Sequence, residues 1–226
     1  MKRMMKSGVR GAATLALFAL VFTALMAGTY ALTRDTVKQN ELAAKVALLA
    51  QVLPAGSYDN ALADDAIVVP KLDAAQLGND ADSHIYLAKK AGRTVAAVIE
   101  ATAPDGYAGK IRLLIGIDTN GTVLGVRVVS HKETPGLGDY IDAAKSDWIA
   151  QFGGKSIANP GDARWKVKKD GGQFDSRAGA TISPRAVVKA IHATLVYVAA
   201  HRAALFDARP AVSSEARPAQ RSGDPA

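Results

Sequence analysis

The segment 110–130, KIRLLIGIDTNGTVLGVRVVS, decides the fold of this 226-residue chain. Two runs rich in Ile, Leu and Val, 110–118 and 122–130, flank the tetrapeptide Asp118-Thr119-Asn120-Gly121. Asn and Gly tolerate the positive φ angles that a tight hairpin turn requires. Strands joined by such a turn pair in antiparallel orientation, so this segment predicts an antiparallel sheet.

The preceding residues extend the sheet. Two further strand-like runs, His84–Lys89 and Arg93–Thr102, are separated by the turn dipeptide Ala91-Gly92. Residues 55–80 have little pattern, and we expect irregular structure or short strands there. Residues 165–168, WKVK, alternate apolar and basic side chains. This alternation predicts an edge strand with its lysines in water.

Helical segments surround these strands. Asp35–Val52 has apolar residues at spacings of three to five and precedes Pro54, as expected of a helix. Asp139–Phe152 is expected to be a short helical segment in which Trp148 and Phe152 make a core contact. The fold class is therefore α+β, an antiparallel sheet flanked by helices.

The segment Pro184–Arg202 is the strongest helix candidate of the domain. Ser183 and Pro184 suit its N-cap and first helical position. Its apolar face is expected to bury Val187, Ile191, Leu195 and Val198.

An uncharged stretch of 23 residues, Gly11–Thr33, lies between Arg10 and Arg34. As a helix it rises about 35 Å, enough to cross a hydrocarbon core of about 30 Å. A cleaved signal peptide is the alternative, but its apolar core is shorter, about 7–15 residues. We therefore expect one retained transmembrane helix.

Positive charge before this helix predicts the topology. Four of the seven net positive charges precede the apolar stretch, at Lys2, Arg3, Lys6 and Arg10. Such charges stay on the cytoplasmic side. We expect a single-pass protein of the bacterial inner membrane with a cytoplasmic N-terminus and a periplasmic main domain. Because the remaining charge is dispersed, nucleic acid is not an expected partner.

These features divide the chain into five expected parts. They are a cytoplasmic N-terminus (1–10), a transmembrane helix (11–33), a connecting helix (34–54), the main domain (55–206) and a disordered tail (207–226). The tail assignment depends on its Pro, Ala, Ser and Arg content and its lack of hydrophobic pattern.

Cysteine is absent from the chain. This excludes disulfides, thiolate zinc sites, cysteine-ligated iron–sulfur clusters and thiol catalysis. The four histidines, at positions 84, 131, 192 and 201, have no ligand spacing, so no metal site is expected. His131 lies just before the segment 133–138, and we expect it either to contact that segment or to lie at the surface.

Two loop segments carry the functional signal. Residues 175–181, DSRAGAT, present the Thr181 hydroxyl just before a helix start. On local evidence this is an ordinary loop, although a helix N-terminus also favours a phosphate group. Residues 133–138, ETPGLG, follow a strand and locally predict a Pro-Gly turn.

In this order and at this distance, the two segments resemble the FMN-binding domain family of membrane-tethered redox subunits, in particular the G subunits of Rnf electron transport complexes. The family pattern Asp-x-x-Ser/Thr-Gly-Ala-Ser/Thr is matched by Asp175, Gly179, Ala180 and Thr181. Ala178 departs from it, since the family usually has Ser or Thr there. The resemblance covers about residues 104–190, with the segments GYAGKI (106–111) and GID (116–118), and the anchor.

The resemblance implies covalent FMN on Thr181 through a phosphoester bond, attached by a flavin transferase that uses FAD and a divalent metal. Glu133 and Thr134 are then expected to contact the isoalloxazine edge, and Leu137 its face. The implied cofactor-binding residues are Glu133, Thr134, Gly136, Leu137, Gly138, Ser176, Gly179 and Ala180.

The implied function is electron relay through FMN in an Rnf-type ion-translocating complex, beside other membrane subunits. We expect no catalytic residue and no independent substrate turnover. Two alternatives stay open at this point. One is the C subunit of a sodium-translocating NADH:quinone reductase, which shares the anchor, domain and flavin motif. The other is a tethered non-redox scaffold or ligand-binding domain.

Overall fold

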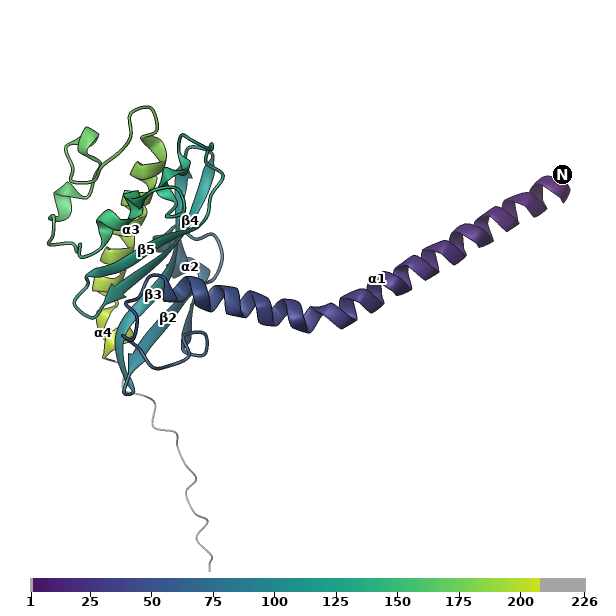
Figure 1. Ribbon diagram of the computed structural model, residues 1–226, viewed down its shortest axis with the longest axis horizontal. Coiled ribbons are helices and arrows are strands. Elements are labelled where there is room, and N and C mark those ends of the chain that lie inside the picture. The colour runs from purple at the N-terminus through teal and green to yellow at the C-terminus, as the bar shows by residue number, and fades with distance from the viewer. Residues whose placement is uncertain (1, 208–226) are drawn as a thin grey trace, which may run out of the picture. The chain divides into compact units, whose positions relative to one another are not determined.

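A computed structural model describes residues 2–207 of the chain (Figure 1). The chain divides after Ala50 into two compact units. The first is a single helix, α1 (Lys2–Ala50), which contains an apolar span, Leu15–Val37, long enough to cross a membrane, with a mean hydropathy of 2.0. The helix is continuous through residue 34, and the expected boundary there between a membrane helix and a connecting helix stays a prediction.

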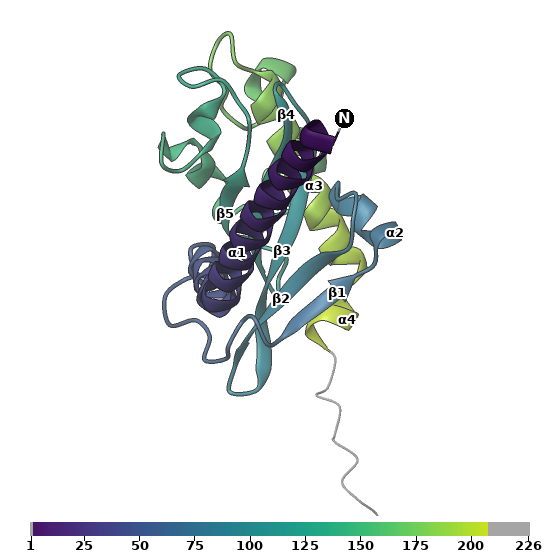
Figure 2. The same cartoon turned by 90° about the vertical axis from the view of Figure 1, so that its right-hand side faces the viewer.

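The second unit contains a five-stranded antiparallel sheet, with the strands in the order β1-β2-β3-β4-β5. Figure 2 shows β1 and β5 at opposite edges. The predicted α+β class and antiparallel sheet are confirmed, and the short strand β1 comes from the weakly patterned segment 55–80. The strands are β1 (Ala66–Val69), β2 (Ser83–Lys90), β3 (Arg93–Gly106), β4 (Gly109–Asp118) and β5 (Val123–Ser130).

The two predicted hairpin turns are present. Ala91 and Gly92 have φ angles of 49° and 75° between β2 and β3, and Gly121 has φ 79° between β4 and β5. At the second turn, the Asp118 carboxylate accepts hydrogen bonds from the backbone amides of Asn120 and Thr122, both at 2.8 Å. Local turn chemistry therefore joins β2 to β3 and β4 to β5 as hairpins.

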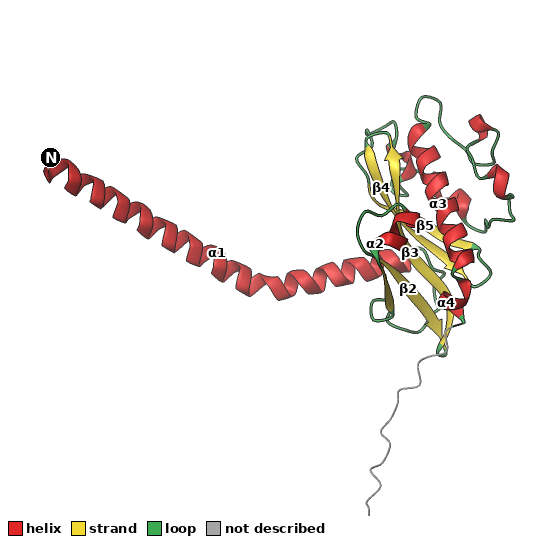
Figure 3. Cartoon of the chain, turned by 180° about the vertical axis from the view of Figure 1, so that it is seen from behind, coloured by secondary structure: helices red, strands yellow, loops and turns green. Residues whose placement is uncertain are grey.

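Helix α3 (Ile182–Ala200) packs on one face of the sheet (Figure 3). The predicted apolar face is confirmed, because its four residues belong to the buried core together with odd-numbered residues of β3 such as Ile99. The predicted N-cap is wrong. The helix begins at Ile182 with Thr181 as N-cap, so Ser183 lies inside the first turn. A short helix, α4 (Arg202–Phe206), follows.

The other face of the sheet is covered by residues 51–65. Here Val52, Leu53 and Leu62 are buried. The backbone of Val52 passes close to Gly116 of β4. A Cβ on Gly116 would lie 2.3 Å from the Val52 carbonyl oxygen. Between β1 and β2 the chain forms α2 (Lys71–Ala74) and the 3₁₀ turn η1 (Ala75–Leu77).

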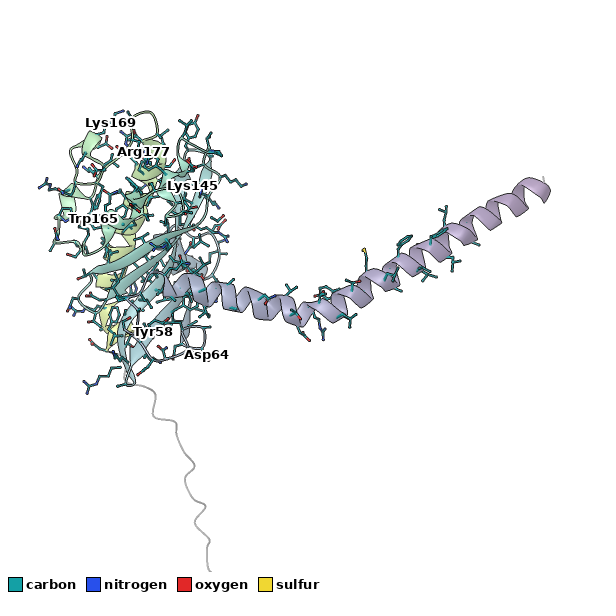
Figure 4. All side chains as sticks on the ribbon, in the orientation of Figure 1. Tyr58, Asp64, Lys145, Trp165, Lys169 and Arg177 are labelled. Atoms are coloured by element: carbon teal, nitrogen blue, oxygen red, sulfur yellow. The ribbon has the colours of Figure 1, made fainter. Side chains whose placement is uncertain are left out.

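Residues 131–181 form a long connection with little regular structure. The labelled side chains of Figure 4 place Lys145, Lys169 and Arg177 at the end of this unit opposite to Tyr58 and Asp64. The connection contains four 3₁₀ turns: η2 (Asp139–Ile141), η3 (Asp147–Phe152), η4 (Asp162–Arg164) and η5 (Lys168–Asp170).

Two expectations for this connection are corrected. Asp139–Phe152 is two 3₁₀ turns instead of one helical segment, although the contact of Trp148 with Phe152 is confirmed, with ring centroids 5.3 Å apart. Residues 165–168 form no strand, because only an isolated bridge joins Val167 to Phe174. The alternation instead buries Trp165 and Val167 and leaves the lysines exposed. The expected tail lies, apart from its first residue, outside the described residues.

Candidate functional site

The loop before α3 is built around a β-turn. The Ala180 amide donates to the Arg177 carbonyl oxygen at 3.2 Å, and Gly179 has φ +82° at the third position of this turn. A left-handed φ at that position favours glycine, since a side chain there meets backbone strain. Thr181 follows this turn directly and is the N-cap of α3.

The Tyr140 side chain holds this turn through two hydrogen bonds. Its hydroxyl accepts a hydrogen bond from the Arg177 amide and donates one to the Ala180 carbonyl oxygen, both at 3.0 Å. The Arg177 guanidinium also lies over the Tyr140 ring, 4.6 Å from its centroid. Burial raises the pKa of the Tyr140 hydroxyl, so the group stays neutral and keeps its donor proton.

Two side chains of η3 hold the first residue of the loop. The Trp148 indole Nε1 donates to the Asp175 carbonyl oxygen at 2.6 Å. The Asp175 amide donates to Gln151 Oε1 at 2.8 Å. With Tyr140, these contacts fix both ends of the loop to the η2–η3 segment.

The second functional segment forms the Pro-Gly turn expected from its sequence. The amides of Leu137 and Gly138 donate to the Thr134 carbonyl oxygen at 3.1 and 3.2 Å. Gly136 has φ +77°, and its amide donates to Asp139 Oδ1 at 2.9 Å. The turn leaves Leu137 exposed at its tip.

Glu133 joins the two segments. Its carboxylate accepts a hydrogen bond from the Ser183 hydroxyl at 2.6 Å and one from the Ala108 amide at 3.2 Å. Both Glu133 and Ser183 are buried. The carboxylate therefore ties the loop after β5 to the first turn of α3 and to the β3–β4 hairpin.

His131 supports Glu133 from outside the pocket. Its Nδ1 accepts a hydrogen bond from the Glu133 amide at 3.1 Å, and its Nε2 lies 3.9 Å from Asp142 Oδ2. An accepting Nδ1 leaves the proton on Nε2 in the neutral ring. His131 is thus beside the site but does not line it.

The two segments and the β3–β4 hairpin enclose a pocket of about 200 Å³. Most of the predicted site residues line it, whereas Gly136 and Ser176 do not. The pocket is smaller than the roughly 300–1,000 Å³ of sites that enclose a whole ligand, so a flavin held here keeps part of its surface outside. The lining residues are Tyr107, Glu133, Thr134, Leu137, Gly138, Gly179, Ala180, Thr181, Ile182 and Ser183.

Three lining residues are additions to the predicted set. Tyr107 and Ile182 are 70% and 46% exposed and, with Leu137, give the rim an apolar character. The sequence predicts Ser183 as the helix N-cap, and its role as a hydrogen-bond donor to Glu133 has no local sequence signal. For Tyr107 a signal existed, because its segment 106–111 is part of the family resemblance.

Thr181, which is 8% exposed, lies at the N-terminal end of α3, a position that favours a phosphate group. It lines the pocket, and its side chain makes no capping hydrogen bond. The first amides of α3, at Ile182 and Ser183, precede Pro184, and helix N-terminal amides favour a phosphate. The hydroxyl, the open amides and the apolar rim fit a flavin mononucleotide with its phosphate at the helix end.

Comparison with known proteins agrees with this geometry. Two family models match the chain, the FMN-binding domain at residues 106–196 and the RnfG N-terminal region at residues 1–52. Similar curated proteins from several bacteria are named as the G subunit of an ion-translocating oxidoreductase complex. The relative from Pseudomonas aeruginosa strain UCBPP-PA14 is 47% identical over 212 residues, 93% of this chain and 97% of the relative. The relatives from Escherichia coli strain K12 and Yersinia pestis are each 50% identical, over 87% and 86% of this chain and 92% of each relative.

Proposed function

The chain belongs to the family of ion-translocating oxidoreductase complex G subunits, and from this membership we propose that it carries its flavin covalently, as a phosphoester on Thr181. It is a membrane-anchored FMN electron-transfer subunit of an Rnf-type complex and works beside the other subunits of that complex. The sodium-translocating reductase and the non-redox scaffold are not favoured by these relatives.

The position of Thr181 carries the proposal. Its uncapped side chain lines the pocket at the N-terminal end of α3. A phosphoester there receives the open amides and the partial positive charge of the helix end. Since Pro184 has no amide proton, Ile182 and Ser183 supply these donors.

The remaining predicted residues have two kinds of role in this proposal. Thr134, Leu137, Gly138, Gly179 and Ala180 line the pocket and contact the flavin. Gly136 shapes its turn through its positive φ angle, and both Gly136 and Ser176 lie outside the pocket lining. Bound FMN supplies the redox chemistry, while the protein holds and orients it.

Attachment requires a partner enzyme, because a threonine hydroxyl is a weak nucleophile. In the proposed reaction, the Thr181 oxygen attacks the FMN phosphorus of FAD and a new P–O bond forms. The pyrophosphate bond breaks, AMP leaves, and the hydroxyl proton passes to a base of the transferase. A divalent metal bound by the transferase stabilises the departing phosphate.

The test compares full-length wild type with Thr181→Ala and Thr181→Ser, each co-expressed with a flavin transferase. After denaturing electrophoresis, we expect a fluorescent band for wild type, none for Thr181→Ala and a restored band for Thr181→Ser, which keeps the hydroxyl. Fluorescence that survives in Thr181→Ala would reject Thr181 as the attachment residue. A dark wild-type band would reject covalent attachment altogether.

A further inference from the structure

A buried carboxylate lies in the pocket wall, and no cationic side chain among the described residues lines the pocket with it. Glu133 is 4% exposed, and it is the one charged side chain among the described residues that line the pocket. Its hydrogen bonds come from neutral groups, the Ser183 hydroxyl and the Ala108 amide. Burying an unpaired charge is costly, so this carboxylate has no evident advantage for stability over a neutral side chain of the same shape.

The surrounding backbone leaves room for this carboxylate. A Cβ at Gly138 would lie 2.6 Å from Glu133 Oε2, and a Cβ at Gly106 would lie 3.0 Å from Oε1. Two glycines, from the loop after β5 and from the end of β3, therefore approach its two oxygens. A side chain at either glycine would crowd the carboxylate.

The nearest cations on α3 are occupied elsewhere. Arg185 and Lys189 line a separate hollow together with Ile182. The Arg185 guanidinium donates two hydrogen bonds of 2.6 Å to Asp170, and Lys189 Nζ lies 3.0 Å from Asp105. Neither cation is paired with Glu133, so the pocket wall has a net negative charge.

We propose that Glu133 lowers the redox potential of the flavin by holding a negative charge in the pocket wall. Reduction adds electrons to the flavin, and a fixed negative charge on a buried side chain of the pocket wall opposes this. The hydrogen bonds from Ser183 and Ala108 hold the charge at a fixed place. This role differs from the direct polar contact to the flavin edge that the sequence suggests, and it rests on the proposed attachment at Thr181.

The test is a redox titration of full-length flavinylated protein, comparing wild type with Glu133→Gln and Ser183→Ala. Glutamine keeps both hydrogen bonds, since its oxygen accepts from Ala108 and its amide donates to the Ser183 oxygen. It therefore removes the charge alone. At the wild-type midpoint, we expect the reduced-to-oxidised ratio of Glu133→Gln to rise at least tenfold, which is about 30 mV for a two-electron couple.

Ser183→Ala is the matched control, because it removes one hydrogen bond and keeps the charge. We expect its midpoint to rise by less than that of Glu133→Gln, because the carboxylate stays and loses one of the two hydrogen bonds that favour its charged form. A Glu133→Gln midpoint equal to wild type, or an equal upward shift in Ser183→Ala, would overturn the proposal. Folded Glu133→Gln without flavin would overturn it too, since Glu133 would then act in attachment. A flavin-free wild type would overturn the attachment at Thr181 and this inference with it.

A second variant covers the case in which Glu133→Gln fails to fold. Thr134 is exposed and lines the same pocket, so Thr134→Lys adds a cation without disturbing the buried carboxylate. We expect its midpoint to lie above that of Thr134→Gln, a neutral variant that loses the same threonine contact. Equal midpoints for these two variants would overturn an electrostatic role for the pocket wall.

Discussion

At the scale of single residues, three neighbouring positions at the start of α3 have different roles. The Thr181 side chain lines the pocket and makes no capping hydrogen bond. The Ser183 hydroxyl donates to the buried Glu133 carboxylate. Pro184 has no amide proton, so the helix end has one donor fewer that needs an acceptor. The sequence Ser-Pro favours a cap at Ser183. That prediction was wrong because Glu133, 50 residues upstream, offers Ser183 a buried acceptor at 2.6 Å. A long-range partner of this kind leaves no trace in the local pattern.

Gly179→Ala tests whether the attachment turn depends on its left-handed residue. At φ +82° a Cβ meets no neighbouring atom, so the expected cost is backbone strain alone, about 1–2 kcal/mol. We expect this loss in the free energy of unfolding, measured by urea denaturation, or faster amide hydrogen exchange at Ala180 if the loop opens locally. Unchanged stability together with unchanged exchange would show that the turn tolerates another conformation.

At the scale of elements, the η2–η3 segment is the support of the attachment loop. Its side chains contribute four hydrogen bonds to backbone atoms of Asp175, Arg177 and Ala180. The sequence indicated the aromatic contact of Trp148 with Phe152 and did not indicate this support. Side chains that bind the backbone of a distant loop have no periodicity, so pattern analysis cannot detect them.

Tyr140→Phe tests this support. The substitution keeps the ring and removes the hydroxyl that bridges Arg177 and Ala180. We expect this to destabilise the closed loop by about 1–2 kcal/mol relative to the open loop. We expect faster amide hydrogen exchange at Arg177. Tyr30→Phe, on exposed α1, is the matched control and should leave that exchange unchanged. Slow exchange at Arg177 in Tyr140→Phe would mean that the hydroxyl is dispensable.

In the sheet, sequence patterns predict the positions of the strands but not the bulge that changes their pairing. Turn residues and alternating apolar positions located β2 to β5 within a few residues. In β5, however, strict alternation puts Val123 and Val126 on opposite faces. The structure buries both in one core because the register shifts between Gly116 and Ile117 of β4. A bulge depends on the partner strand, so β5 alone does not reveal it.

At the scale of the whole molecule, the chain combines a long apolar helix with a domain that has its own core. Composition predicted this division, and the structure locates the end of the first unit at Ala50. Helix α1 continues through residue 34, and the expected division there into a membrane helix and a connecting helix stays a prediction. We propose, from the charge before the span, that the second unit lies in the periplasm.

The absence of cysteine makes this topology directly testable. Asn120→Cys adds a thiol at an exposed turn of the domain, and Ser7→Cys adds one before the span. In intact cells with a permeabilised outer membrane, an impermeant maleimide should label Asn120→Cys and not Ser7→Cys. The reverse labelling pattern would place the domain in the cytoplasm.

The central claim is that Thr181 carries the flavin, and a single peptide can test it. Trypsin releases residues 178–185, AGATISPR, in which Thr181 and Ser183 are the two hydroxyl residues. Tandem mass spectrometry of this peptide, from protein co-expressed with a flavin transferase, should show one FMN added with loss of water and fragment ions that place it on Thr181. An unmodified peptide, or fragment ions that place the flavin on Ser183, would contradict the account.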